Sequence, residues 1–324
     1  MDEIAGRVAQ SISDALEATF EPLSTEPVAG GCIHKAFKLQ GEDGGGKRAY
    51  FVKANAGEHA EMFEAEANGL RAIANAAAIR VPKVVVLGSR ARGNDGGEND
   101  SRDEDEHAWL VLEWLDLAPL DMDAPIDPKP GAKVTPAARL GEALAAQHRA
   151  PQKKFGWGRH NFIGSSPQPN VWSDDWLSFW RTHRLQAQLR LAAHKRLPSK
   201  MIDRGERLLA DAEILFRTYS PAKSLLHGDL WTGKAAALAD GTPVVFDPAV
   251  YVGDREADLA MTELFGGFPK DFQAGYRAAW ALDDGYSVRR NFYNIYHLLN
   301  HANLFGGDYV RESEKLIERV LAEL

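Results

Sequence analysis

The pattern of apolar residues changes near residue 117, and this change most constrains the fold. Before it, short apolar runs are separated by turn sequences, as in AFKL, the glycine-rich GEDGGG and YFVK, which predicts antiparallel strands. After it, apolar residues recur mainly at helical spacing, with one strand-rich segment at 224–249. We therefore predict an α+β, bilobal chain with a small antiparallel-sheet N-lobe over residues 1–116 and a larger, mainly helical C-lobe over residues 117–324.

Helical periodicity sets the expected helices in both lobes. It predicts helices over residues 2–19 and 58–78, and then over 136–149, 173–192, 200–218, 258–265, 271–280, 287–305 and 311–323. Two further apolar runs, VPKVVVLG and HAWLVLEWL, predict additional strands in the N-lobe.

The composition narrows the class of protein. The chain has 38 Lys and Arg against 46 Asp and Glu, a net charge of −8, which disfavours nonspecific binding to nucleic acid or to an anionic membrane. Its single cysteine excludes an intramolecular disulfide and a thiolate zinc cluster. No apolar run approaches the roughly 20 residues of a membrane span. We predict a soluble, cytoplasmic protein.

The strand-rich segment carries the most informative spacing. His227-Gly228-Asp229 is followed by Lys234, and Asp247 then ends an apolar strand. Kinase-type phosphoryl transfer uses His-x-Asp-x-x-x-x-Asn followed by a strand that ends in a metal-binding Asp. In that pattern Asp229 accepts the proton of the substrate hydroxyl and Asp247 binds Mg²⁺. The alternative is that His-Gly-Asp is only a turn and that Asp247 caps a strand.

The N-lobe holds a candidate phosphate-binding lysine. Lys53 lies in Tyr-Phe-Val-Lys, which is similar to the kinase strand whose lysine contacts the α- and β-phosphates. Glu66 falls among the core-facing positions of the next helix, where an acid is costly unless it is paired. We therefore predict a Lys53–Glu66 ion pair, with Glu64 as the alternative partner.

Two further N-lobe segments fit nucleotide binding. Gly30-Gly31 precedes an apolar strand, as in loops whose backbone approaches phosphates closely. Glu113-Trp114-Leu115 ends the last predicted strand of this lobe, where a kinase places the hinge that hydrogen-bonds adenine. Each of these features is common by itself, but their order along the chain is that of a kinase.

Taken together, the motifs resemble those of the fructosamine (ketosamine) 3-kinase family, which has the aminoglycoside-phosphotransferase-like, protein-kinase-like fold. The similar segments are GGCIHKAFKL, YFVKAN, MFEAEANGL, VLEWLDL, FGWGRHNFIGS, QPNVWSDDWLSFW, HGDLWTGK, FDPAVYVGDREADLAMTELFGGF and YHLLNHANLFG. The resemblance implies phosphorylation of the sugar 3-hydroxyl of ketosamines, free or protein-bound, with ATP and Mg²⁺. The product decays and releases the amine, so the family acts in deglycation.

The resemblance also implies roles for individual residues. Asp229 is then the catalytic base, Asp247 the Mg²⁺ ligand, Lys53 a phosphate contact and Glu66 the residue that positions Lys53. Trp231 either stacks on the sugar or packs in the core, and His227 is expected to support the catalytic loop. Four further residues either line the acceptor cleft or belong to the helical core: Trp172, Asp174, Asp175 and Trp176. At least two of Asp254, Glu256 and Asp258 are expected to cap helices or form structural ion pairs. His297 and His301 are four residues apart on a predicted helix, but no third ligand accompanies them, which disfavours a zinc site.

Lys234 departs from the pattern. Both the general kinase motif and the family motif place asparagine here, whose carbonyl oxygen ligates a metal, whereas a lysine ammonium has three donors and no acceptor. Lys234 is therefore expected to impair metal binding and turnover, unless it points to solvent and another group ligates the metal.

The sequence leaves other functions open. The alternatives are a kinase for another small hydroxyl substrate, such as an aminoglycoside or choline, and a catalytically dead nucleotide-binding protein. Cys32, beside Gly30-Gly31, is either a buried core residue or a redox site that links two chains, so a monomer and a redox-linked dimer both remain open.

Overall fold

The computed structural model describes residues 3–29, 33–89, 107–121 and 134–324. It divides into two compact units: unit 1 comprises Met1–Ala72 and Val81–Asp116, and unit 2 comprises Ile73–Arg80 and Leu117–Leu324. The change of unit after Asp116 falls where the sequence places it, whereas 73–80 groups with unit 2. The backbone explains this grouping, because the Arg80 carbonyl accepts a hydrogen bond from Val245 N at 3.0 Å.

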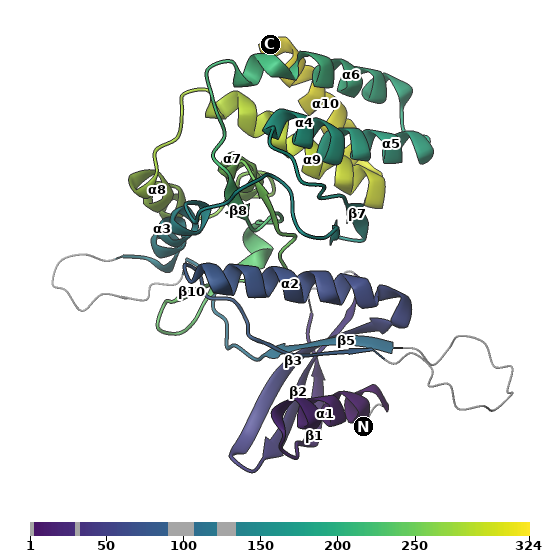
Figure 1. The fold of residues 1–324 in the computed structure, drawn as a ribbon, viewed down its shortest axis with the longest axis vertical. Helices are drawn as coiled ribbons and strands as arrows, with labels where there is room; N and C mark the ends of the chain where they lie inside the picture. The colour runs from purple at the N-terminus through teal and green to yellow at the C-terminus, as the bar shows by residue number, and fades with distance from the viewer. Residues whose placement is uncertain (1–2, 30–32, 90–106, 122–133) are drawn as a thin grey trace, which may run out of the picture. The chain divides into compact units, whose positions relative to one another are not determined.

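In unit 1 the described residues form an antiparallel sheet with the order β1-β2-β3-β5-β4. Figure 1 labels β1, β2, β3 and β5 of this sheet. The strands are β1 (Glu21–Pro27), β2 (Lys35–Asp43), β3 (Gly46–Ala56), β4 (Val84–Ser89) and β5 (His107–Glu113). The predicted antiparallel sheet is thus confirmed, and the glycine-rich turn joins β2 to β3 as expected. Sequence analysis missed β1, an edge strand whose residues are mostly exposed and therefore give no apolar pattern.

Two helices of the N-terminal part of the chain bury apolar faces; α1 and residues 60–72 of α2 belong to unit 1, and the last residues of α2 belong to unit 2. Helix α1 (Glu3–Leu16) buries Val8 and Ile12 in a cluster that also contains Leu39 and Val52 of the sheet. Helix α2 (Ala60–Ala76) follows a 3₁₀ turn at Gly57–His59 and buries one face, formed by Phe63, Ala67, Leu70 and Ile73. The buried residues of each helix recur at helical spacing.

Unit 2 is mainly helical. Its helices are α3 (Pro136–His148), α4 (Trp176–Trp180), α5 (Gln186–His194), α6 (Ser199–Asp211), α7 (Arg255–Thr262), α8 (Lys270–Ala279), α9 (Tyr286–Phe305) and α10 (Asp308–Glu323). The single helix predicted over 173–192 is instead α4 and α5 joined by a π-helical turn at Arg181–Leu185. The helix predicted to start at 258 starts at Arg255, because Asp254 caps its N-terminus.

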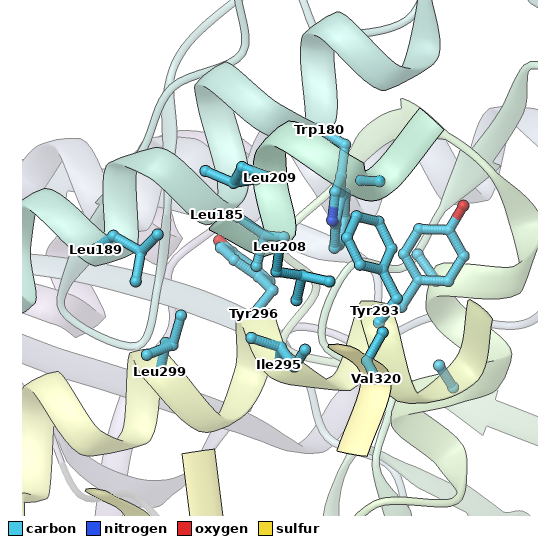
Figure 2. Close-up of a cluster of buried hydrophobic side chains, with 14 of the residues drawn as sticks. Trp180, Leu185, Leu189, Leu208, Leu209, Tyr293, Ile295, Tyr296, Leu299 and Val320 are labelled. Carbon is cyan, nitrogen blue, oxygen red and sulfur yellow. The ribbon is translucent and has the colours of Figure 1, made fainter. Parts of the chain in front are cut away.

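The core of unit 2 is rich in aromatic side chains. Figure 2 shows Trp180 packed against Tyr293 and Tyr296 of α9, with ring centroids 4.9 and 5.5 Å apart. Burial of each large apolar side chain contributes roughly 1.5–3 kcal/mol, so this cluster accounts for much of the stability of unit 2. None of the helices in the described part of the chain has the length and apolar character needed to cross a membrane.

The described residues of unit 2 also form three short antiparallel strand pairs. They are β6 (Asn161–Ile163) with β7 (Ser166–Gln168), β8 (Ser224–Leu226) with β11 (Tyr251–Gly253), and β9 (Ala235–Ala237) with β10 (Pro243–Val245). Strands β8 to β10 correspond to the strand-rich segment found in the sequence. The polar residues of that segment therefore follow the ends of paired, buried strands.

Candidate active site

The His227-Gly228-Asp229 loop follows β8, and its backbone is sharply constrained. Gly228 has a φ of +84°, and a Cβ atom there would lie 2.0 Å from the carbonyl oxygen of Ala249. The His227 carbonyl accepts a hydrogen bond from Ala249 N at 2.8 Å. Only glycine combines this conformation with so close an approach, so the middle residue of the motif is needed to pack the loop against the chain after Asp247.

Asp258 on α7 holds this loop through hydrogen bonds to its backbone. Its Oδ2 accepts from His227 N at 2.7 Å and its Oδ1 accepts from Gly228 N at 2.8 Å. The buried His148 donates from Nε2 to the same carboxylate at 3.1 Å, and its Nδ1 lies 2.9 Å from the Tyr276 hydroxyl. Burial raises the pKa of Asp258, but the hydrogen bonds and the His148 contact outweigh it, so the pKa lies below its usual value.

His227 supports the loop, as predicted. Its Nε2 lies 3.0 Å from the Phe246 carbonyl oxygen and its Nδ1 accepts from Asp229 N at 3.3 Å. Burial lowers the pKa of His227 to about 4. The ring is therefore neutral at physiological pH and acts through hydrogen bonds rather than as a proton carrier.

Asp229 is presented at the end of this loop with its side chain half-buried. Burial raises its pKa to about 6, the charges of Asp247 and Asp258 add to the rise, and the charge of Lys234 opposes it. A carboxylate with such a pKa is ionised at neutral pH yet more basic than an ordinary aspartate. These are the properties of a general base.

Asp247 and Lys234 face each other across the β9–β10 pair. Phe246 N donates to the Lys234 carbonyl at 3.1 Å, which continues the strand pairing to the residue before Asp247. Asp247 itself adopts a φ of +54°, a conformation that asparagine and aspartate tolerate best among residues with a side chain. The Lys234 ammonium contacts Asp247 Oδ2 at 2.5 Å.

This contact bears on the Mg²⁺ that the family resemblance implies. Asp247 is a carboxylate of the kind that Mg²⁺ prefers, but the position expected to supply an amide oxygen supplies an ammonium already bound to Asp247. Across the described ranges, no cluster of three His, Cys, Asp or Glu residues could hold a metal. The residues at 234 and 247 therefore do not fit a site in which both are metal ligands.

In unit 1, the predicted ion pair is present. Lys53 Nζ on β3 contacts Glu66 Oε1 and Oε2 on α2 at 2.8 and 2.9 Å. Their side chains are 10% and 12% exposed, so the pair is largely shielded from water. Lys53 is thereby held in one position, as a phosphate contact requires.

The hinge prediction concerns Glu113, Trp114 and Leu115. Glu113 exchanges two hydrogen bonds with Lys83, since its N donates to the Lys83 carbonyl at 2.9 Å and its Oε2 accepts from Lys83 N at 3.1 Å. The Trp114 indole donates to Asp116 at 2.9 Å. Leu115 is partly buried. Adenine binding by this segment stays a prediction, and Gly30, Gly31 and Cys32 lie outside the described residues.

The tryptophans separate into exposed and buried ones. Trp231 is 37% exposed, so the alternative of simple core packing is wrong for this residue. Its ring lies over Gly233, where a Cβ atom would come within 2.2 Å of the ring. Trp172 is 49% exposed, whereas Trp176 is buried and donates to the Tyr293 hydroxyl at 2.9 Å. Asp175 caps α4 by accepting from Ser178 N at 2.7 Å.

Other acids and histidines have structural roles. Asp254 caps α7 and accepts from the Tyr293 hydroxyl at 2.6 Å, and Glu256 forms a buried two-bond ion pair with Arg289. Burial lowers the pKa of His297 to about 3, and its carbonyl contacts the His301 ring at 2.8 Å. Capping and pairing are therefore the roles of Asp254 and Glu256, as expected.

A buried amide network escaped the sequence analysis. Asn161 donates to the Val250 carbonyl at 2.7 Å, and Gln168 donates to the Ala249 carbonyl at 3.1 Å and accepts from the Tyr296 hydroxyl at 2.7 Å. These bonds fix the backbone just after Asp247. These residues lie in the segments FGWGRHNFIGS and QPN, whose polar sequence is typical of a surface loop. Only the clustering of Asn and Gln in these segments could have indicated a buried network.

Comparison with known proteins then decides the family. The family model described as Fructosamine kinase matches residues 4–323. The chain belongs to the fructosamine kinase family. A probable ketoamine kinase from Synechocystis sp. is 39% identical over 319 residues, which cover 97% of this chain and 96% of that protein.

Two other proteins are similar to this member of the fructosamine kinase family over most of its length. A chloroplastic protein-ribulosamine 3-kinase of Arabidopsis thaliana is 35% identical over 299 residues, 92% of this chain and 82% of that one. The crystal structure of a putative fructosamine-3-kinase from Haemophilus somnus has a TM-score of 0.79 at 27% identity and covers 97% of this chain and 96% of its own. The predicted protein-kinase-like fold is confirmed. Family membership also confirms the enzyme class, a phosphotransferase with an alcohol acceptor.

Proposed function

We propose that this chain transfers the γ-phosphoryl group of ATP to the 3-hydroxyl of ketosamines, namely ribulosamine, erythrulosamine or fructosamine, free or attached to proteins. The family and the names of the Synechocystis and Arabidopsis relatives support this acceptor class. The observation that carries the proposal is the Asp229 carboxylate, half-buried, with its pKa raised to about 6, on a loop fixed by Asp258. That arrangement suits a base for a sugar hydroxyl.

The proposed reaction uses Asp229 to orient and deprotonate the acceptor. As the hydroxyl oxygen bonds to the γ-phosphorus, its proton passes to Asp229 and the bond from phosphorus to the β,γ-bridging oxygen breaks, releasing ADP. Lys53, held by Glu66, contacts the α- and β-phosphates and offsets their charge. The backbone at 113–115 is assigned to adenine.

Trp231 is assigned to the acceptor. Its indole is 37% exposed directly after the catalytic loop, and an apolar ring face of this kind stacks on the C–H face of a sugar. An acceptor contact made through one exposed side chain is compatible with a ketosamine on a protein surface, so glycated proteins are included among the proposed substrates.

Lys234 is expected to limit turnover in this version of the enzyme. Loss of one charge-stabilising interaction in phosphoryl transfer costs about 3 kcal/mol, or about a hundredfold in rate. The Lys234–Asp247 contact of 2.5 Å also favours a second candidate function, a protein that binds nucleotide or ketosamine without turning it over.

A substrate panel distinguishes these functions. The wild type and Lys234→Asn are assayed for ADP release with ribulosamine, erythrulosamine, fructosamine, an aminoglycoside and choline. We expect turnover with a ketosamine, faster in Lys234→Asn, and none with the other two acceptors. Thermal stabilisation by ATP without turnover in either version would instead identify a binding protein, and turnover of the aminoglycoside or choline would assign another acceptor.

A further inference from the structure

The contact between Lys234 and Asp247 is built into the local backbone. Lys234 precedes β9 and Asp247 follows β10, and the hydrogen bond from Phe246 N to the Lys234 carbonyl brings the two residues side by side. The side chains are 19% and 29% exposed, so the pair is more shielded than the surface ion pairs of the protein, such as Lys154 with Asp174. It is therefore a defined feature rather than a chance surface contact.

The charges around this pair make an ammonium favourable there. The charges of Asp247 and Asp258 act on Asp229, and the charge of Lys234 opposes them there. Its charge also acts on His227. A positive charge at position 234 therefore offsets part of the negative charge of the neighbouring carboxylates.

An ammonium and a divalent cation cannot share the same place. Mg²⁺ takes oxygen ligands at about 2.0–2.1 Å in an octahedral arrangement. The Lys234 Nζ atom lies 2.5 Å from Asp247 Oδ2, offers no lone pair and repels a second cation. An asparagine at this position would offer an oxygen and no charge.

We propose that the Lys234 ammonium takes the place of one cation, so that the complex of this chain with a nucleoside triphosphate holds one divalent ion fewer than the complex of its Lys234→Asn variant. The inference rests on nucleotide binding, which is part of the proposed function. It goes beyond the proposed function, because a lysine side chain of the protein would supply a positive charge that a bound metal ion supplies in the kinase pattern.

The test counts metal ions directly. Wild type, Lys234→Asn, Lys234→Met and Lys200→Asn are titrated with Mn²⁺ at saturating AMP-PNP, and free Mn²⁺ is measured by electron paramagnetic resonance. Lys200→Asn is the matched control, because Lys200 is an exposed lysine on α6 whose nearest carboxylate oxygen is 3.9 Å away. Lys234→Met removes the charge without adding a ligand oxygen.

We expect Lys234→Asn to bind about one more Mn²⁺ per nucleotide than wild type, and Lys200→Asn to match wild type. In EDTA, AMP-PNP affinity should fall about tenfold or more in both Lys234→Asn and Lys234→Met, since each loses the positive charge that this proposal puts in place of a metal ion. Circular dichroism and thermal unfolding confirm that each variant is folded. Equal Mn²⁺ counts in wild type and Lys234→Asn, with nucleotide bound by both, would overturn the inference alone. Absence of nucleotide binding in every variant would overturn the proposed function with it.

Discussion

The raised pKa of Asp229 has a consequence for stability as well as for catalysis. The unfolded chain holds this proton with a pKa near 3.8 and the folded protein with a pKa of about 6, so the folded state binds it more tightly. Stability therefore falls as pH rises from about 4 to about 6, and stays at that lower level at higher pH. Replacement of the carboxylate by a neutral group removes this loss, so Asp229→Asn should be more stable than wild type at pH 8.

The size of the effect follows from the same values. A pKa that rises from 3.8 to about 6 corresponds to about 3 kcal/mol for a fully shielded carboxylate. Asp229 is only half-buried, and water screens part of that cost, so we expect about 1–2 kcal/mol. For units of this size such a change raises Tm by about 3–6 °C.

The assay is thermal unfolding of apo protein in EDTA, at pH 8 and at pH 5. Asp229→Asn should show the higher Tm at pH 8, a difference about half as large at pH 5, and no phosphorylation of a ketosamine. Asp240→Asn is the control with opposite sign, because Asp240 accepts from Thr242 N at 2.8 Å and its pKa is lowered by that bond. A Tm for Asp229→Asn equal to or below that of wild type at pH 8 would refute the reasoning.

The remaining predictions concern the residues that hold the site. Gly228→Ala should lower kcat more than tenfold and lower the free energy of unfolding by more than the roughly 1–3 kcal/mol that a positive φ alone costs. Gly266→Ala is the control for backbone strain alone, because Gly266 has a φ of +87° and no atom lies within 4 Å of the added Cβ. Equal losses of stability in urea unfolding of the two variants would contradict the close contact at Gly228. In Asp258→Asn one of the backbone donors His227 N and Gly228 N loses its acceptor, so the free energy of unfolding should fall by about 1–3 kcal/mol. The variant should also lower kcat with little change in the KM for ATP, and an unchanged kcat in steady-state assays would show that Asp258 does not position the loop. Lys53→Met should raise the KM for ATP and lower the Tm, and adding Glu66→Gln should recover part of that Tm because the two residues form an ion pair. If the Tm losses of the two single variants simply add in the double variant, the two residues are not coupled.

Features that depend on local pattern were predictable from the sequence. The antiparallel sheet of unit 1 follows from alternating apolar runs and a glycine turn, and the Lys53–Glu66 pair follows from an acid placed on the buried face of a helix. The candidate catalytic loop was indicated by the spacing of His227, Asp229 and Asp247, which places polar residues directly after short apolar strands. In each case a short stretch of sequence contains the physical reason.

Features that depend on distant partners were not predictable in this way. The π-helical turn at Arg181–Leu185 contains Arg184, a buried arginine that donates to Asn170 at 2.7 Å, and nothing in the residues 173–192 shows that partner. The same holds for Gln168, whose acceptor is the Ala249 carbonyl. The sequence showed that Lys234 cannot ligate a metal, but its contact with Asp247 required the fold.

We propose that this chain phosphorylates the 3-hydroxyl of a ketosamine with Asp229 as base. The most direct measurement is ³¹P–¹H correlation NMR of the product formed from ATP and a ribulosamine by the Lys234→Asn protein, with Lys234→Asn/Asp229→Asn as the matched control. The account predicts a phosphate ester coupled to the proton on the sugar C3 in the first sample and none in the control. A phosphate on another carbon, no product, or equal product in the control would contradict it.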